Sequence, residues 1–371
     1  MADSAYICRL PPEVWALIAT HCENCLTQAQ LRVTNRGLRA VLDTPRIWRT
    51  TRADLIHSFN LMADQGHLTP IQWLTGTFII TTRDLCVNNN YALRWACANG
   101  HLAVAQWLAA RFELKANGAR TENNWALRWA CKNGHLEVAR WVAQEFGLLA
   151  DDARAYNNLA LCWACVGGHL NIVQWLLQEF GLTSEDVRAD DNRALRWACM
   201  DGRLVVAQWL TQEYALTTED VRAEDGFALR RACANGHLAV VRWLVQEFIL
   251  GSADERTMGN LALCWACAYG ELEIARWLAQ EFGLTASDVR GDTNQALRWA
   301  CANGHLEVAQ WLAEEYILTT GDARYDGDQA LKWARANGHL EAVQWLTRVF
   351  GLAAEESHAR DKRVFCARTA A

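Results

Sequence analysis

The segment Ala296–Leu312 reads ALRWACANGHLEVAQWL, and versions of it recur along most of the chain at one fixed spacing. Its glycine, Gly304, belongs to a series in which every step is 34 residues. The members of this series are Gly66, Gly100, Gly134, Gly168, Gly202, Gly236, Gly270, Gly304 and Gly338. Repetition at such a period predicts a solenoid of stacked units, because one unit is too small to cover its own apolar face.

Each unit is predicted to be a hairpin of two helices. Apolar residues follow one another at helical spacing on both sides of Asn303 and Gly304. They are Ala296, Leu297, Trp299, Ala300 and Cys301 before this pair, and Leu306, Val308, Ala309, Trp311 and Leu312 after it. An Asn-Gly pair between two such runs is typical of a left-handed helix end. The predicted fold class is therefore all-α.

Sixteen of the nineteen tryptophans occupy just two places in the repeat, those of Trp299 and Trp311. Burying one tryptophan removes roughly 150–250 Å² from water. Since a single hairpin has too little core to order itself, we expect these indoles to be buried between neighbouring hairpins.

The repeated pattern A-L-x-x-A-(C/A)-x-x-G-H-L-x-V-(A/V)-x-W-L resembles the ankyrin repeat. Ala-Cys stands where that family has Ala-Ala, Gly-His matches directly, and Trp-Leu replaces Leu-Leu. The resemblance covers about four-fifths of the chain. It implies a solenoid of nine ankyrin-type repeats: an atypical first repeat in residues 51–90 and eight regular repeats in residues 91–352.

Two departures from the ankyrin pattern concern the start of each repeat. The Thr-Pro pair that usually opens the first helix is missing, and the period is 34 residues rather than 33. Between repeats the chain has segments such as Leu182–Arg188, LTSEDVR. A threonine followed by acidic residues is typical of a capped helical turn. We therefore expect one-turn helices where ankyrin repeats carry β-hairpin fingers.

Composition excludes several functional classes. The formal net charge is -6, whereas nucleic-acid binding needs a basic surface. No apolar run reaches the roughly 18–20 residues that cross a bilayer, and the first residues lack the pattern of a secretory signal. We therefore expect no nucleic-acid partner and no membrane association.

Half of the fourteen cysteines share one repeat position. They are Cys97, Cys131, Cys165, Cys199, Cys233, Cys267 and Cys301. A small apolar side chain is needed there for close helix packing. We expect these thiols to be reduced, which indicates a cytoplasmic or nuclear location.

Residues 1–50 do not follow the repeat, and they resemble the F-box. The usual F-box run is L-P-x-E-(I/V), a hydrophobic helix, L-x-x-V, and a terminal D-P-x-(L/I)-W. The matching residues are Leu10, Pro11, Glu13, Val14, Ile18, Leu31, Val33, Pro45, Ile47 and Trp48. The resemblance implies that these residues bind the Skp-type linker subunit of a cullin-RING ubiquitin ligase. The alternative is that residues 1–50 form an apolar helical cap on the solenoid.

No motif for catalysis or metal binding stands out. Cysteine and histidine recur four apart, as in Cys97 and His101, but Arg203 and Glu271 replace the histidine in two repeats. The chain also lacks the usual hydrolase, phosphate-binding and metalloprotease motifs. We expect no enzymatic activity, no catalytic residue, no metal and no cofactor. The opposing hypothesis, a metal-dependent or redox enzyme, predicts bound zinc.

At the start of each first helix, where the scaffold does not need a fixed residue, the side chains differ from repeat to repeat. Aromatic and basic side chains alternate there, as in protein-binding hot spots. The candidate target-binding residues are Tyr91, Arg94, Trp125, Arg128, Arg193, Arg196, Phe227, Arg230, Arg298 and Lys332. In the alternative, the aromatics fix the helix starts and the arginines pair with nearby acidic turns, for example at Asp190.

These patterns together predict a non-catalytic, monomeric adaptor. We expect it to be the substrate receptor of a cullin-RING ubiquitin ligase that binds an unidentified target protein through the ankyrin array. The combination resembles the F-box/ankyrin proteins of large DNA viruses of amoebae, which implies host targets. The alternative is an ankyrin scaffold that sequesters its target with no ligase link. We expect residues 353–371 to be a basic, disordered tail outside the repeats.

Overall fold

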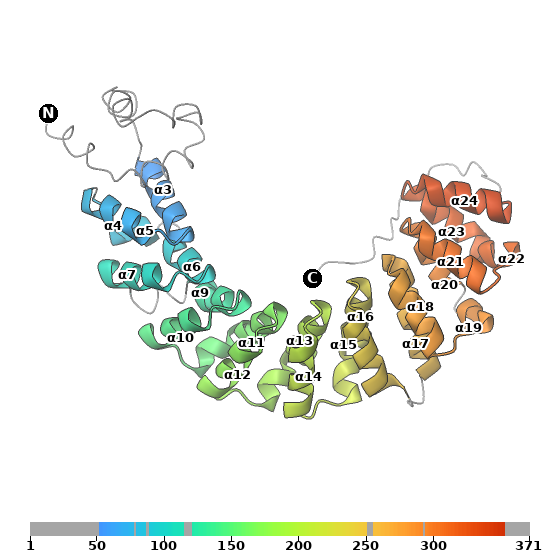
Figure 1. The fold of residues 1–371 in the computed structure, drawn as a ribbon, viewed down its shortest axis with the longest axis horizontal. Helices are drawn as coiled ribbons and strands as arrows, with labels where there is room; N and C mark the ends of the chain where they lie inside the picture. The colour runs from blue at the N-terminus through green and yellow to red at the C-terminus, as the bar shows by residue number, and fades with distance from the viewer. Residues whose placement is uncertain are drawn as a thin grey trace, which may run out of the picture. The chain divides into compact units, whose positions relative to one another are not determined.

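The structure is a computed structural model that describes residues 52–77, 79–86, 89–114, 121–250, 255–291 and 294–352. Within these ranges the chain forms helices and no strand (Figure 1). It divides into two compact units, one ending at Leu182 and the other beginning at Thr183.

Among the residues that the structure describes, the first unit contains four helical hairpins. Their first helices are α3 (Arg52–Asp64), α6 (Tyr91–Ala98), α9 (Thr121–Lys132) and α11 (Ala150–Gly167). Their second helices are α4 (Leu68–Thr77), α7 (Leu102–Phe112), α10 (Leu136–Glu145) and α12 (Leu170–Glu179), and the short α5 (Thr82–Cys86) follows α4. In Figure 1 the first helices of this unit lie in one layer and the second helices in another.

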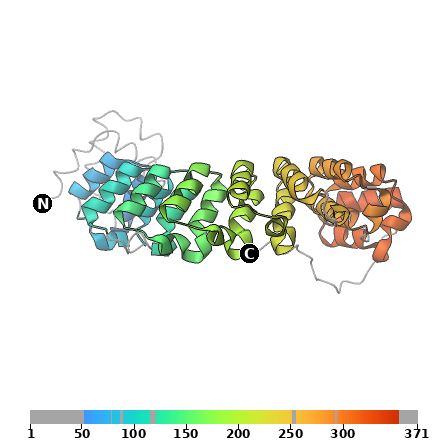
Figure 2. The same cartoon turned by 90° about the horizontal axis from the view of Figure 1, so that it is seen from below.

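The second unit contains five hairpins among its described residues. The first helices are α13 (Ser184–Met200), α15 (Thr218–Ala234), α17 (Glu255–Tyr269), α20 (Gln295–Ala302) and α23 (Tyr325–Ala336). The second helices are α14 (Leu204–Glu213), α16 (Leu238–Leu244) with its continuation η3 (Val245–Ile249), α18 (Leu272–Glu281), α21 (Leu306–Glu315) and α24 (Leu340–Phe350). Two short helices, α19 (Ala286–Gly291) and α22 (Thr320–Ala323), precede α20 and α23. Within each unit the hairpins follow one another in chain order (Figure 2). The predicted all-α solenoid of helical hairpins is confirmed.

Two physical reasons explain why a glycine stands at the end of each first helix. Gly304 has a φ of +79°, a left-handed conformation that favours glycine. In addition, a Cβ at Gly304 would lie 2.4 Å from Nδ1 of His339, which belongs to the next repeat. The same contact joins Gly66 to His101, Gly100 to His135, Gly134 to His169, Gly202 to His237 and Gly270 to His305. These six histidines therefore pack on the preceding repeat, which the repeat pattern alone did not show.

The expected one-turn helices are confirmed. α19 and α22 are separate short helices, whereas α11 and α13 each begin with such a turn and continue into the first helix through a kink. In α13 the kink consists of Asp190, Asp191 and Asn192, all with positive φ. Asn and Asp tolerate this conformation better than other non-glycine residues. These polar residues thus lie at the start of the first helix, directly before the place where the ankyrin pattern has Thr-Pro.

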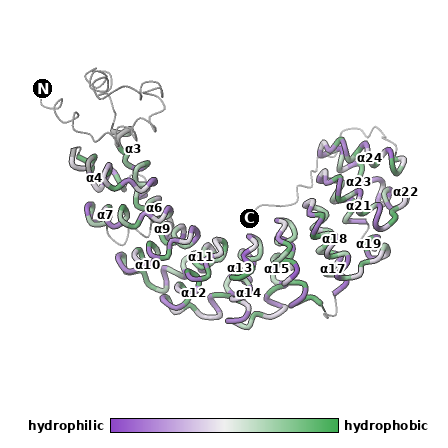
Figure 3. Tube along the Cα trace, viewed as in Figure 1, coloured by the Kyte–Doolittle hydropathy of each residue, from purple (hydrophilic) through white to green (hydrophobic). Residues whose placement is uncertain are grey.

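The core lies between the two helix layers of each hairpin and between successive hairpins. Figure 3 shows apolar and polar segments interspersed along the hairpins. The residues turned inward include Leu297, Cys301 and Leu312, each fully buried. Nine cysteines of the described residues are free thiols in buried positions. The predicted packing role of the shared cysteine position agrees with this burial.

The tryptophans are less buried than predicted. Of the two tryptophan positions, the second-helix one is buried at Trp175, Trp311 and Trp345. This position is half-buried at Trp107, Trp141, Trp209, Trp243 and Trp277, and so is every first-helix tryptophan of the described residues. Most second-helix indoles meet the ring of an aromatic residue five positions later, as Trp345 meets Phe350 edge-on at 5.4 Å. The indoles therefore contribute to packing and at the same time keep part of their surface accessible.

Among the described residues, no helix is both long enough and apolar enough to span a membrane. In the same residues, no group of three or more His, Cys, Asp or Glu side chains is arranged to hold a metal ion.

Candidate functional site

The residues predicted from the sequence fall into two groups in the structure. Residues 1–50, with all ten F-box-like positions, and the tail 353–371 lie outside the described residues. The ten candidate target-binding residues are all described, and each lies on a first helix. The first unit holds Tyr91, Arg94, Trp125 and Arg128, and the second unit holds Arg193, Arg196, Phe227, Arg230, Arg298 and Lys332.

In the first unit, five rings from three successive first helices form an aromatic row: Tyr91, Trp95, Trp125, Trp129 and Trp163. Neighbouring ring centroids are 5.7 Å apart for Tyr91 and Trp95, and 5.3 Å for Trp95 and Trp125. The distance is 5.2 Å both from Trp125 to Trp129 and from Trp129 to Trp163. All five side chains are half-buried, so the row combines internal packing with an accessible edge.

Two cations lie on the faces of this aromatic row. The guanidinium carbon of Arg94 is 4.9 Å from the ring centroid of Trp125. Nζ of Lys132 is 4.7 Å from Trp129 and 4.1 Å from Trp163. A cation at such distances is attracted by the ring quadrupole, which holds the side chain in place.

Lys132 is a residue that the sequence reasoning missed. A signal existed in the sequence, because the equivalent positions in the other regular repeats are uncharged. They are Ala98, Val166, Met200, Ala234, Ala268, Ala302 and Ala336. Trp95, Trp129 and Trp163 were likewise assigned to packing alone, although the structure makes them part of the accessible row.

In the second unit, Phe227 is surrounded by arginines. The guanidinium carbons of Arg196, Arg230 and Arg231 lie 4.9, 5.7 and 5.2 Å from its ring centroid. Arg230 also lies 5.9 Å from the ring of Trp265. The predicted alternation of aromatic and basic side chains thus becomes direct contact here.

The remaining candidates of the second unit have contacts within the scaffold. Arg193 forms an ion pair with Asp190, and Arg196 donates a hydrogen bond of 2.7 Å to the carbonyl of Asp190. Only 8% of Arg196 is exposed, which leaves little of it for a partner to touch. Arg298 donates to Oε1 of Gln329 at 2.9 Å, whereas Lys332 is exposed. The contacts of Arg193 and Arg196 are those of the alternative in which arginines pair with acidic turns.

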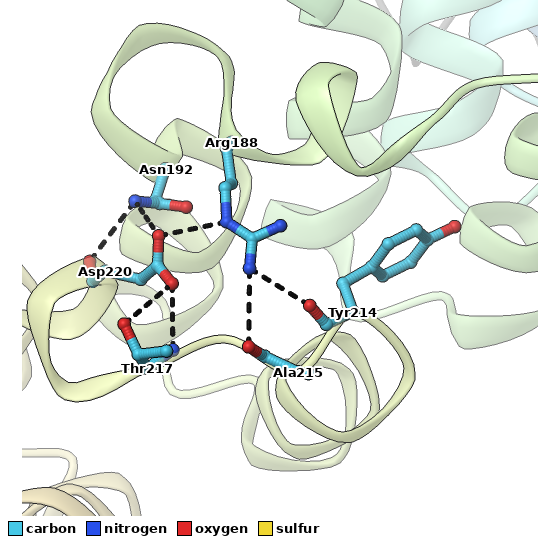
Figure 4. A network of polar contacts seen from close by, with 6 residues as sticks. All are labelled: Arg188, Asn192, Tyr214, Ala215, Thr217 and Asp220. Carbon is cyan, nitrogen blue, oxygen red and sulfur yellow. Dashed lines mark hydrogen bonds and ion pairs between the residues drawn. The ribbon is translucent and has the colours of Figure 1, made fainter.

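A polar contact group between successive repeats keeps the first helices in register. We call it the inter-repeat clamp, made of Arg188, Asn192, Thr217 and Asp220 (Figure 4). Oδ1 of Asp220 accepts from Nε of Arg188 at 3.2 Å and from the amide of Asn192 at 3.1 Å. Oδ2 accepts from the backbone N–H of Thr217 at 2.8 Å and from its hydroxyl at 3.2 Å.

The charge of Asp220 is favoured by this clamp. Partial burial acts to raise the pKa of its carboxyl group, but the hydrogen bonds from Thr217 and Asn192 and the charge of Arg188 outweigh that effect, so the pKa is lowered. The same arrangement recurs at Asp322, which accepts from Nε of Arg290 at 3.0 Å.

The asparagine of the clamp is a second feature that sequence reasoning missed. It occurs at Asn90, Asn124, Asn158, Asn192, Asn260 and Asn294, which fit the 34-residue period. All six are buried. The side-chain amides of Asn124, Asn192 and Asn294 donate to the carbonyl of an aspartate 28 residues later. This periodic asparagine could have been found by aligning the repeats, but its partner lies in the next repeat.

Two open hollows lie along the second helices, at corresponding places four repeats apart. The first, of about 360 Å³, is lined by Arg140, Gln144, Trp175, Gln178 and Glu179. The second, of about 630 Å³, includes Arg276, Gln280, Trp311, Glu314 and Glu315 in its lining. Their correspondence follows from the repeat itself, so they are less informative than the aromatic row, in which Lys132 is singular.

Comparisons with known proteins agree with the repeat analysis. A family model described as ankyrin repeats in three copies matches residues 59–152 and 145–225, and a second, described as ankyrin repeats in many copies, matches residues 263–313. Together the matches cover more than half of the chain. A search of the curated proteins returned no match.

Proposed function

We propose that this chain is the substrate receptor of a cullin-RING ubiquitin ligase. The chain belongs to the ankyrin-repeat family, and its repeats support a role as a protein–protein interaction adaptor. In this proposal residues 1–50 bind the Skp-type linker subunit, and the first helices of the array bind the protein to be ubiquitinated. The array then fixes the distance between the ligase and its target.

The array half of the proposal is supported by the accessible aromatic and basic side chains of the first helices. Aromatic residues and arginine carry much of the binding energy in protein interfaces, because they combine a large contact area with directed polar groups. The half-buried row from Tyr91 to Trp163 has both properties. The position of Tyr91 and Trp125 varies from repeat to repeat, which suits one particular partner rather than the scaffold.

The single observation that carries the ligase half is the order of F-box-like residues that begins with Leu10-Pro11 and ends with Trp48. The resemblance to F-box/ankyrin proteins of viruses that infect amoebae extends the proposal to host target proteins. The site of action would then be the cytoplasm or nucleus of the host cell.

Binding to a purified Skp-type protein tests the ligase half. The full-length chain should bind it, and the triple variant Leu10→Ala, Pro11→Ala, Trp48→Ala should lose at least tenfold in affinity, since buried apolar anchors dominate such interfaces. Lys332→Ala is the matched control, because Lys332 is exposed and lies on α23 in the second unit. The control should bind as the wild type does.

An absence of Skp binding, or equal binding by the triple variant with an unchanged circular dichroism spectrum, would contradict the ligase half. The alternative function, a scaffold that sequesters its target, would then account for the array. That alternative is favoured by one observation: all five rings of the accessible aromatic row lie within residues 91–163, which belong to the ankyrin-type repeats.

A further inference from the structure

We propose that the aromatic row on α6, α9 and α11, together with Arg94, Arg128 and Lys132, is the docking surface for an extended acidic peptide segment of the target protein. This inference rests on the proposed role of the array as a protein-binding adaptor. It does not depend on the ligase half of that proposal. It assigns the chemistry of the partner, which the repeat pattern leaves open.

Lys132 is the residue that distinguishes this surface from the rest of the array. The scaffold does not need a cation at this place, since five of the other seven regular repeats have alanine there. Its ammonium group lies within 5 Å of two ring centroids, and no ion pair with a described carboxylate accompanies it. An ordered cation at an accessible surface attracts an anion from outside the chain.

The charged residues interspersed with the rings of α6 and α9 are all basic, whereas the acidic residues of these helices, Glu122, Asp151 and Asp152, lie near the starts of α9 and α11. The stretches Tyr91–Ala98 (YALRWACA) and Trp125–Lys132 (WALRWACK) contain three basic residues and no acidic residue. The whole chain, by contrast, has a net charge of -6. A basic surface on an acidic protein is complementary to a carboxylate-rich partner, because charge complementarity raises association rates and disfavours wrong partners.

The arrangement of the rings determines what else the partner needs. The faces of Trp125 and Trp129 are turned toward each other at 29°, while Arg94 and Lys132 cover other faces. Stacked nucleobases and cationic ligands both need free ring faces, so neither fits well here. The accessible parts of these half-buried rings instead provide apolar contact for proline or aromatic side chains set between the carboxylates.

The length of the surface suits an extended chain. Packed helices are about 8–10 Å apart, so the two steps from α6 to α11 span roughly 16–20 Å. Extended backbone covers about 3.3–3.6 Å per residue. A peptide of about six residues therefore reaches across the three helices and places acidic side chains near Arg94 at one end and Lys132 at the other.

The test measures binding of two labelled peptides to the full-length chain by fluorescence anisotropy. One probe is Glu-Asp-Glu-Pro-Phe-Glu-Asp-Glu, and the other has lysine in place of every acidic residue. The acidic probe should bind, more weakly at high salt, and the lysine probe should not. Lys132→Ala should weaken binding of the acidic probe about fivefold, as expected for one accessible ion pair. Lys132→Glu should reduce it further and allow the lysine probe to bind.

The variants are chosen so that the fold is retained. Lys132→Ala introduces the residue of five other repeats, and Trp125→Gln introduces the residue found at Gln295 and Gln329. Trp125→Gln should weaken the acidic probe about tenfold, because it removes a ring from the centre of the row. The control Arg348→Ala removes an exposed base from α24, a second helix of the second unit, and should leave binding of the acidic probe unchanged.

Three results would overturn the inference: no binding of the acidic probe, equal binding of the two probes, or tighter binding of an oligothymidylate than of the acidic probe. A target protein that is crosslinked equally by the wild type and by Lys132→Glu would contradict this surface while the adaptor role stands. Skp binding is measured in parallel, and its outcome is independent of these variants because they lie outside residues 1–50.

Discussion

The contact between the turn glycine of one repeat and the histidine of the next makes a specific prediction for Gly304→Ala. Gly304 has a φ of +79°, and a Cβ there would lie 2.4 Å from Nδ1 of His339. Gly338 has nearly the same φ, +81°, but a Cβ there would meet no atom within 4 Å. The two glycines therefore share the backbone effect and differ in the contact between repeats.

The expected cost of each substitution follows from these geometries. A non-glycine residue with positive φ costs about 1–2 kcal/mol, which is the whole effect for Gly338→Ala. In Gly304→Ala the imidazole of His339 must move by about 1 Å to restore an ordinary contact distance, which adds about 1–3 kcal/mol of lost packing. We expect Gly304→Ala to be the more destabilising by that difference.

Urea unfolding followed by far-UV circular dichroism measures both costs, and His339→Ala completes the comparison. In the double variant Gly304→Ala, His339→Ala the extra cost of the new methyl group should largely disappear, since the ring that it displaces is absent. Equal destabilisation by Gly304→Ala and Gly338→Ala, or additive effects in the double variant, would refute the proposed contact between repeats.

Three further predictions concern the clamp, a strained turn and the thiols. The pKa of the Asp220 carboxyl is lowered in the folded chain. The stability that this carboxylate contributes is therefore present above its unfolded pKa of about 3.9 and is lost as the pH falls through the folded pKa. Asp220→Asn should flatten that part of the pH–stability curve, whereas the control Glu219→Gln should leave it unchanged. Ile317→Gly should stabilise the chain by about 0.5–1 kcal/mol in urea unfolding, because Ile317 is a β-branched, exposed residue with a φ of +47°; destabilisation would show that its side chain has a packing role. Burial raises the pKa of the Cys301 thiol to about 12, so iodoacetamide should label it no faster than the chain unfolds. Mass spectrometry that detected alkylated Cys301 before any unfolding would contradict this burial.

Much of the fold could be predicted from the sequence because its determinants are local. Helical spacing of apolar residues and the conformational freedom of Gly304 act within a single hairpin. The 34-residue period is the distance at which these local features recur. The one-turn helices were predicted for the same reason, since the capping contacts between Thr217 and Asp220 span three residues. No knowledge of neighbouring repeats is needed for these features.

The candidate site could be predicted only in part. Tyr91 and Trp125 were identified because their position varies from repeat to repeat, and Arg94 because it belongs to a recurring basic row, but Lys132 was missed. Its significance depends on Trp163, a ring 31 residues later, whose distance from the lysine is set by how two hairpins stack. Arg196 illustrates the opposite error, because its position suggested an accessible surface and its side chain is buried.

The sequence by itself therefore determined that this chain is an all-α array of helical hairpins, since side-chain periodicity and glycine turns act over a few residues. Tertiary structure alone decided which indoles keep an accessible edge, which cations lie on them, and which histidine packs on which glycine. Those features depend on contacts between residues about one repeat apart, and such contacts exist only once the hairpins have stacked.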